Sequence, residues 1–146
     1  MSMPLKRILE AIKNINPKSG VWTPVLSSLN ETAPTVSLTK QSGRYIKIGK
    51  LVYVQFYIQG QITALNGTSN QALITGLPFT PSLISTYSSG LNISTLYNVL
   101  ENDTNAVFVL RTDGIKLQRN YGANTANWKT TTNFILAGSG CYETEE

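Results

Sequence analysis

The sequence predicts an all-β fold, a jelly-roll-like antiparallel β-sandwich preceded by one short α-helix. From Gly20 onward, short runs rich in β-branched and aromatic residues alternate with turn residues, as in sandwiches and barrels. Two of the turns, Gly49-Lys50 and Asp113-Gly114, suit two-residue β-hairpins. Before Pro17, apolar residues instead recur at spacings of three and four, which is the period of a helix.

The composition indicates one domain with a core and an unusually uncharged surface. Of 146 residues, 41% are hydrophobic and only 14% are charged, against about a quarter charged in ordinary globular domains. Ser, Thr, Asn and Gln supply most of the polar surface, which is typical of rigid β-rich fibres, lectins and other surface proteins. There is one cysteine, Cys141, so an intrachain disulfide is excluded, and we expect it to be buried in a strand.

The first predicted element is a helix over residues 4–16. Its apolar stripe comprises Leu5, Ile8, Ile12 and Ile15, and Pro17 disfavours helix at the residue just before it. A helix this short is marginal alone, so the stripe must pack on something. Either the helix folds back on its own domain, or three copies pack around an axis with Ile8 and Ile15 at d positions, where isoleucine favours more than two strands.

The predicted organisation is therefore a helix and linker over residues 1–19 and a β-sandwich over residues 20–146. The expected strands are Val21–Leu26, Thr35–Leu38, Arg44–Ile48, Leu51–Thr63, Gln71–Thr75, Ile84–Tyr87, Leu91–Val99, Ala106–Arg111, Ile115–Arg119 and Asn133–Glu143. Residues 128–132 fit either a further strand or a loop.

The Asp113-Gly114 hairpin is expected to form a type I′ turn that pairs Leu110 with Leu117 and Thr112 with Ile115. This pairing places one apolar set on the core side.

The Gly49-Lys50 hairpin is expected to pair Ile48 with Leu51 and Ile46 with Tyr53, with Gly49 at the first position of a type II′ turn. The two isoleucines then lie opposite the main apolar set of the following strand. Either a bulge shifts the register by one residue, or both faces are buried.

The second face of that following strand carries Leu51, Tyr53, Gln55, Tyr57, Gln59 and Gln61. Aromatic side chains among uncharged polar ones are common at protein interfaces and also occur at saccharide sites. A trimer interface at Tyr53, Gln55 and Tyr57, a ligand surface, and a face half covered by its own loops remain open.

Chemistry typical of enzymes is missing from the sequence. There is no histidine, which removes the usual general base and the commonest zinc ligand. No paired-carboxylate site, phosphate-cradling loop or nucleophile elbow is visible. Outside the C-terminal tail with Glu143, Glu145 and Glu146, the closest acids are Glu101 and Asp103, and they are best explained as part of a turn. We therefore expect no catalysis, no cofactor and no metal.

The basic residues near the first hairpin come nearest to the pattern of a nucleic-acid surface. The basic residues near Tyr45 and Tyr53 are Lys40, Arg44, Lys47 and Lys50, but a charged strand edge that resists edge-to-edge pairing explains them better. No apolar run approaches the length of a membrane span. We expect neither nucleic acid nor a membrane as partner.

Two groups of residues are candidates for binding a saccharide, which needs aromatic faces for stacking and amides or hydroxyls for hydrogen bonds. The first is Tyr121, Asn124, Asn127 and Trp128, in and after a long polar loop. The second is Tyr87, Asn92 and Tyr97. The alternative for both is plain loop structure, with Trp128 anchored in the core.

Four phrases in order carry a resemblance to a known family. They are Gly20-Val21-Trp22-Thr23-Pro24, the run from Gly43 to Val54, Thr75-Gly76-Leu77-Pro78-Phe79, and the closing Gly138-Ser139-Gly140-Cys141-Tyr142-Glu143-Thr144. Together they resemble the receptor-binding or tail-fibre head domains of bacteriophages, as carried by baseplate or minor tail proteins, over roughly residues 20 to 145.

The resemblance implies a homotrimeric, non-catalytic β-sandwich at the tip or side of a phage tail, and thus location in the virion. It implies other tail or baseplate proteins as partners and attachment to a host cell-surface saccharide or protein. No binding residue carries over, because the loops of such domains differ greatly. The alternatives are a purely structural trimerising tail or baseplate subunit and a free-standing lectin-like protein.

Overall fold

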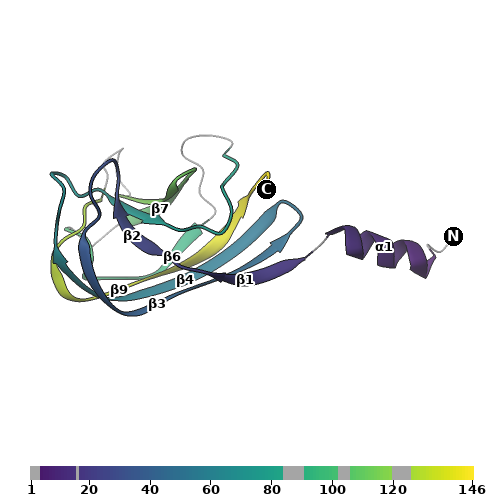
Figure 1. The fold of residues 1–146 in the computed structure, drawn as a ribbon, viewed down its shortest axis with the longest axis horizontal. Coiled ribbons are helices and arrows are strands. Elements are labelled where there is room, and N and C mark those ends of the chain that lie inside the picture. The colour runs from purple at the N-terminus through teal and green to yellow at the C-terminus, as the bar shows by residue number, and fades with distance from the viewer. Residues whose placement is uncertain (1–3, 16, 84–90, 102–105, 120–125) are drawn as a thin grey trace.

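The fold is a two-sheet β-sandwich with a helix extending from its N-terminal end (Figure 1). The computed structural model describes residues 4–15, 17–83, 91–101, 106–119 and 126–146. The described elements are α1 (Leu5–Ile15), β1 (Lys18–Trp22), β2 (Val25–Ser28), β3 (Thr35–Ile48), β4 (Leu51–Ala64), β5 (Ala72–Thr75), β6 (Leu91–Tyr97), β7 (Ala106–Arg111), β8 (Gly114–Arg119) and β9 (Thr131–Glu143).

The described strands form one five-stranded sheet in the order β1-β3-β4-β9-β6 and one four-stranded sheet in the order β2-β5-β8-β7. Every pairing within them is antiparallel. The prediction of an all-β antiparallel sandwich with one short helix is confirmed. The strand predicted over residues 84–87 lies outside the described residues.

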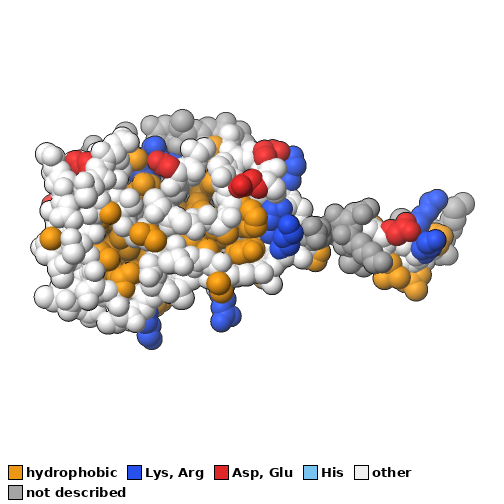
Figure 2. Space-filling view, in the orientation of Figure 1, with side chains coloured by type: hydrophobic (Ala, Val, Ile, Leu, Met, Phe, Trp, Pro, Cys, Tyr) orange, Lys and Arg blue, Asp and Glu red, His pale blue; other side chains and the backbone are white. Residues whose placement is uncertain are grey.

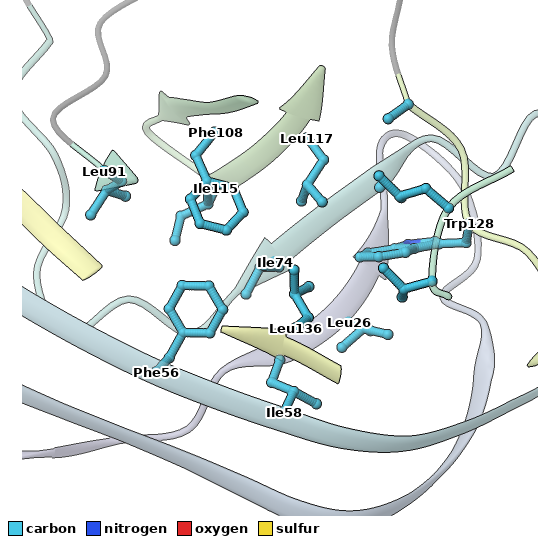
Figure 3. Close-up of a cluster of buried hydrophobic side chains, with 14 of the residues drawn as sticks. Leu26, Phe56, Ile58, Ile74, Leu91, Phe108, Ile115, Leu117, Trp128 and Leu136 are labelled. Atoms are coloured by element: carbon cyan, nitrogen blue, oxygen red, sulfur yellow. The ribbon is translucent and has the colours of Figure 1, made fainter. Parts of the chain in front are cut away.

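The core lies between the two sheets. In β4 every second residue from Val52 to Ile58 is at most 5% exposed, as the period of a half-buried strand requires. Figure 3 shows the Phe56 ring pointing from this sheet toward Phe108 on the opposite sheet. The rings of Phe56 and Phe108 have centroids 5.6 Å apart, so aromatic packing joins the sheets directly.

The predicted strand Val21–Leu26 is wrong as a single element, because the chain changes sheets inside it. β1 ends at Trp22 and pairs with β3, whereas β2 begins at Val25 and pairs with β5. Pro24 between them has no N–H to donate to a ladder. Its carbonyl oxygen accepts a hydrogen bond of 2.8 Å from the Gln41 side chain, which fixes the crossing.

The predicted strands Thr35–Leu38 and Arg44–Ile48 are parts of one 14-residue strand, β3. A register shift between Leu38 and Lys40 interrupts its pairing with β4. Gly60 lies opposite Leu38, where an added Cβ would meet the Ser37 carbonyl oxygen. The polar middle of β3, which looked like a turn, is thus continuous strand with a local bulge.

The Gly49-Lys50 hairpin forms with the predicted pairs, Ile48 with Leu51 and Ile46 with Tyr53. Gly49 has φ 57°, a positive value of the kind that the first position of a type II′ turn requires. No register shift separates these pairs from the rest of β4 near the turn. Ile46 and Ile48 therefore lie on the face opposite the core.

The Asp113-Gly114 hairpin forms, but its predicted register is wrong by two residues. Leu110 pairs with Ile115 and Arg111 with Gly114, so Thr112 and Asp113 form the loop. The predicted assignment of side chains to the two faces of the hairpin is still correct, because a shift of two residues preserves the side on which each side chain lies. Gly114 has φ 152°, and a Cβ there would meet the Ile74 carbonyl oxygen of β5.

One carboxylate organises the loop before β5. Glu31 accepts hydrogen bonds from the backbone N–H groups of Thr68, Ser69 and Asn70, at 3.1, 3.0 and 2.7 Å, and from the Ser69 hydroxyl. The N–H groups of Ser69 and Asn70 contribute most to lowering the pKa of Glu31 below its ordinary value of 4.5. The ionised form is therefore favoured by the fold.

We expect Glu31→Gln to destabilise the protein at neutral pH and to flatten its acid response. Because the pKa of Glu31 is lowered on folding, its stabilisation is complete above about pH 4.5 and is lost as pH falls through the folded pKa. Urea unfolding at pH 7 and pH 3 measures this. The gap between wild type and variant should narrow at pH 3, and a constant gap contradicts the prediction; Glu143→Gln, at an exposed strand position, is the control.

Candidate functional site

The candidate site is the outer face of the five-stranded sheet, the face turned away from the second sheet. The strand registers arrange its side chains in transverse rows. One row is Ser19, Ile46, Tyr53 and Cys141; the next is Val21, Arg44, Gln55, Ser139 and Asn92; the third is Ser42, Tyr57, Ala137 and Thr95. No described element lies over these rows in Figure 1.

The part of this face near the Gly49-Lys50 turn is apolar; we call it the apolar end. Its members are exposed by 80% for Val21, 49% for Ile46, 48% for Ile48, 49% for Leu51 and 37% for Tyr53. They are neighbours by register, so they form one patch rather than scattered residues. Neither expected explanation, a bulge or burial of both faces, holds within the single chain.

Beside the apolar end, the face is hollowed over the boundary of β3, β4 and β9. This polar hollow has a volume of about 250 Å³ and is lined by Ser42, Gly43, Arg44, Gln55, Phe56, Tyr57, Ser94, Gly138 and Ser139. A second hollow, of about 440 Å³, is lined by Ser19, Gly20, Val21, Arg44, Tyr45, Ile46, Tyr53 and Gln55. The two share Arg44 and Gln55, a directly paired couple on β3 and β4.

The hollow has a cationic flank. Lys40 and Arg44 lie on the same side of β3, with Ser42 between them. The Lys40 ammonium is 5.9 Å from the centroid of the Tyr57 ring, within the range of a cation–π contact. The Tyr57 hydroxyl donates a hydrogen bond of 3.0 Å to the Gln59 side chain, which orients the ring along the face.

Cationic side chains project from the lower margin of the sandwich in Figure 2, the side on which Figure 1 places β3 and β4. Among the described residues of the outer face, the one carboxylate is Glu143, which pairs with Leu51 two rows away from Arg44. The positive charge around Tyr57 is therefore not neutralised by a neighbouring acid on this face.

The charged residues of β3 are predicted to protect a sheet edge, and this is wrong for Arg44 and Lys47, which lie where β3 pairs with both β1 and β4. Lys40 lies beyond the last pair with β1, Trp22 with Gly43, so on that side of β3 it does lie at an edge of the sheet. Cys141 was expected to be buried, but its side chain is exposed on the outer face beside Tyr53. The alternation of Cys141 with the buried Tyr142 carried the signal for this, because neighbours along a strand point to opposite faces.

The predicted ligand residues divide three ways. Asn92 and Tyr97 are exposed on β6, and Tyr97 is 54% exposed beside Ile135. Asn127 is half-buried and bridges to Gln71. The residues Tyr87, Tyr121 and Asn124 lie outside the described residues.

The prediction that Trp128 contacts a ligand is wrong. Its side chain is fully buried, and its indole N–H donates a hydrogen bond of 2.6 Å to the Ser27 carbonyl oxygen. Figure 3 shows the ring in the core near Leu26. The alternative of a core anchor describes it correctly.

The predicted interface residues of the sheet, Tyr53, Gln55 and Tyr57, all lie on the outer face. In α1, Leu5 is 70% and Ile8 is 40% exposed, and Figure 2 shows apolar side chains gathered along one side of the helix. The side chains of Ile12 and Ile15, the other predicted interface residues, lie outside the described part of the chain. Whether either surface forms a trimer contact stays a prediction.

Sequence reasoning missed Ser42 and Ser139 and did not assign Lys40 and Arg44 to a binding surface. The period-two spacing of Lys40, Ser42 and Arg44 could have placed all three on the Tyr57 face. Their convergence with Ser139 depends on the pairing of β4 with β9, which local sequence does not reveal.

Among the described residues, no group of three or more Cys, Asp or Glu side chains is placed to hold a metal ion. Within the same ranges, no helix has the length and apolar character needed to cross a membrane. Neither the family models searched nor the curated proteins compared with the chain gave a match.

Proposed function

We propose that this protein is a non-catalytic, homotrimeric attachment module of a phage tail or baseplate that binds a host cell-surface saccharide or protein. The observation that carries the proposal is the outer face, on which an exposed apolar end adjoins a polar, cationic hollow. The resemblance of the four sequence phrases to phage receptor-binding heads supports the same function. In the virion, the partners are other tail or baseplate proteins.

Two apolar surfaces support self-association. The apolar end of the sheet leaves Ile46 and Ile48 half exposed, and α1 presents Leu5 and Ile8 on one side. An isolated helix of 11 residues is marginal in water, so packing against other copies would stabilise it. Exposed apolar patches rimmed by polar residues mark interaction sites in soluble proteins.

Light scattering on a sizing column tests this assembly. We expect a mass about three times the 16.0 kDa of one chain. Ile8→Glu and Ile46→Glu each place a charge on one of the two surfaces in the intact chain, and both residues are exposed enough for a single chain to tolerate the change. Loss of the trimer in one variant identifies the surface that holds it.

Val107→Glu is the matched control, because Val107 is 37% exposed but lies on the second sheet. It should leave the mass unchanged. A full-length monomer contradicts the assembly and favours a free-standing lectin-like protein.

Attachment itself is tested by incubating fluorescently labelled protein with a panel of bacterial isolates. Saturable binding to some isolates, removed by stripping their surface saccharides or proteins, is the expected result. A trimer that binds no isolate favours the second candidate, a purely structural trimerising subunit, for which the exposed apolar end and helix would suffice.

A further inference from the structure

The side chains of the polar hollow indicate which class of ligand the proposed attachment function would use. Arg44 lies at the centre of this region, shared by both hollows. Lys50 pairs with Glu145 and Arg111 with Asp113, and among the described residues no carboxylate is paired with the Arg44 guanidinium. A guanidinium offers paired donors that match a carboxylate or phosphate group.

The groups around Arg44 suit a sugar. Gln55 pairs directly with Arg44 and presents an amide, and Ser139 pairs with Gln55 from the other side. Tyr57 lies one row along β4 from Gln55, and its ring is half-buried with one edge tied to Gln59. Amide and hydroxyl groups make directional hydrogen bonds with the hydroxyl groups of a sugar, while an oriented aromatic face packs against the C–H side of a sugar ring.

The positive charge beside the polar hollow favours anionic sugars over neutral ones. Lys40 stands on the other side of Ser42 from Arg44, so two cations flank the Ser42–Tyr57 pair. Successive same-face residues on a strand are about 6.8 Å apart, so the Cα atoms of Lys40 and Arg44, two such steps apart, are separated by roughly 13–14 Å. Their long side chains can both extend toward an anion bound over Ser42, which would be attracted to each of them.

The size of the polar hollow fits a short saccharide. Its volume of about 250 Å³ is below the range of roughly 300–1,000 Å³ typical of sites for drug-sized ligands, so it suits one sugar unit. The adjoining hollow is lined partly by Val21, Ile46 and Tyr53 of the apolar end, which is a proposed contact between copies, so the saccharide is assigned to the polar hollow alone.

We propose that the polar hollow binds an anionic saccharide, with Arg44, assisted by Lys40, holding its carboxylate or phosphate and Tyr57 packing against the sugar ring. This inference rests on the proposed attachment function and specifies its ligand class. Carboxylated and phosphorylated sugars share the chemistry that Arg44 recognises, so the test separates them.

Two matched pairs of probes are titrated into the full-length protein by calorimetry and by amide chemical shifts: 3′-sialyllactose against lactose, and glucose 1-phosphate against glucose. We expect the anionic member of at least one pair to bind more tightly than its neutral partner. The shifts should centre on Ser42, Gln55 and Ser139, and binding should weaken as salt rises. Which anionic probe binds identifies the carboxylate or the phosphate as the source.

Arg44→Gln should weaken binding of the anionic probe by about tenfold or more, because it removes charged hydrogen bonds. Arg44→Lys should give an intermediate loss, since it keeps the charge but not the paired donors. Lys116→Gln removes the same charge from β8 in the second sheet and should change nothing.

Two results would overturn the inference. Equal binding of neutral and charged probes, unaffected by Arg44→Gln but lost in Tyr57→Leu, would leave the attachment function standing with a neutral ligand. If none of the four probes binds at about 10 mM but the protein still adsorbs to bacterial cells, attachment depends on a different kind of ligand. Failure of adsorption as well would remove the attachment function itself.

Discussion

Trp128→Ala is expected to destabilise the protein by about 3–5 kcal/mol, the range for removing a large aromatic side chain from a core. The indole is fully buried, and its N–H is the donor to the Ser27 carbonyl oxygen. The substitution therefore leaves both a cavity and a carbonyl without its donor. Since domains are stable by only about 5–15 kcal/mol, this loss removes between roughly a fifth and all of the folding free energy.

Urea unfolding monitored by circular dichroism measures this loss. Trp128→Phe is the matched variant, because it keeps an aromatic ring in the core but cannot donate to Ser27. It should lose less than the alanine variant. A loss below about 1 kcal/mol for Trp128→Ala would contradict the core role, and binding assays on this variant would report unfolding rather than ligand contact.

Gly138→Ala is expected to destabilise the protein by about 1–3 kcal/mol through overpacking. Gly138 lies in the middle of β9 and faces the core, where an added Cβ would meet the Phe108 ring of the opposite sheet. The same Cβ would lie 2.8 Å from the Asn92 carbonyl oxygen of β6. The ring can shift only by disturbing its contact with Phe56, and the carbonyl belongs to paired strand.

The control for this substitution is Ser139→Ala, the next residue of β9, whose side chain lies on the outer face. It should change the free energy of unfolding by less than about 0.5 kcal/mol. The double variant Gly138→Ala/Phe108→Leu should recover part of the loss, because the smaller side chain yields space. Equal stability of Gly138→Ala and wild type would show that the sheets are not in close contact there.

The comparison of two hairpins shows what local sequence determines. At Gly49-Lys50 the glycine meets the need of the turn itself, so the register followed from the turn residues. At Asp113-Gly114 the glycine serves a different need, the close approach of the Ile74 carbonyl oxygen on β5. A requirement set by a strand 40 residues earlier in the chain is invisible to a rule about turns, which explains the shift of two residues.

Part of the candidate site could be predicted from the sequence. Alternation in β4 correctly gathered Tyr53, Gln55 and Tyr57 on one face, because a regular strand fixes the side of every residue. Their neighbours Arg44 and Ser139 come from β3 and β9, which flank β4 in space. Pairing of distant strands is a tertiary property, so the composition of the hollow required the structure.

Trp128 shows the opposite limit. A tryptophan after a polar loop, outside any periodic run, gives no indication of which way its ring turns. Its burial is decided by Leu100, to which it bridges, and by the Ser27 carbonyl on β2, both far away in sequence. Neither partner could be identified before the two sheets were placed.

The position of β9 has a consequence for the order of folding. β9 lies between β4 and β6, although it is the last strand of the described chain to be synthesised. Until residues 131–143 leave the ribosome, β4 has one unpaired edge and the five-stranded sheet is in two pieces. An unpaired edge invites association with other chains, and pairings this distant form slowly. The nascent protein therefore depends most on protection from aggregation just before its synthesis passes β9.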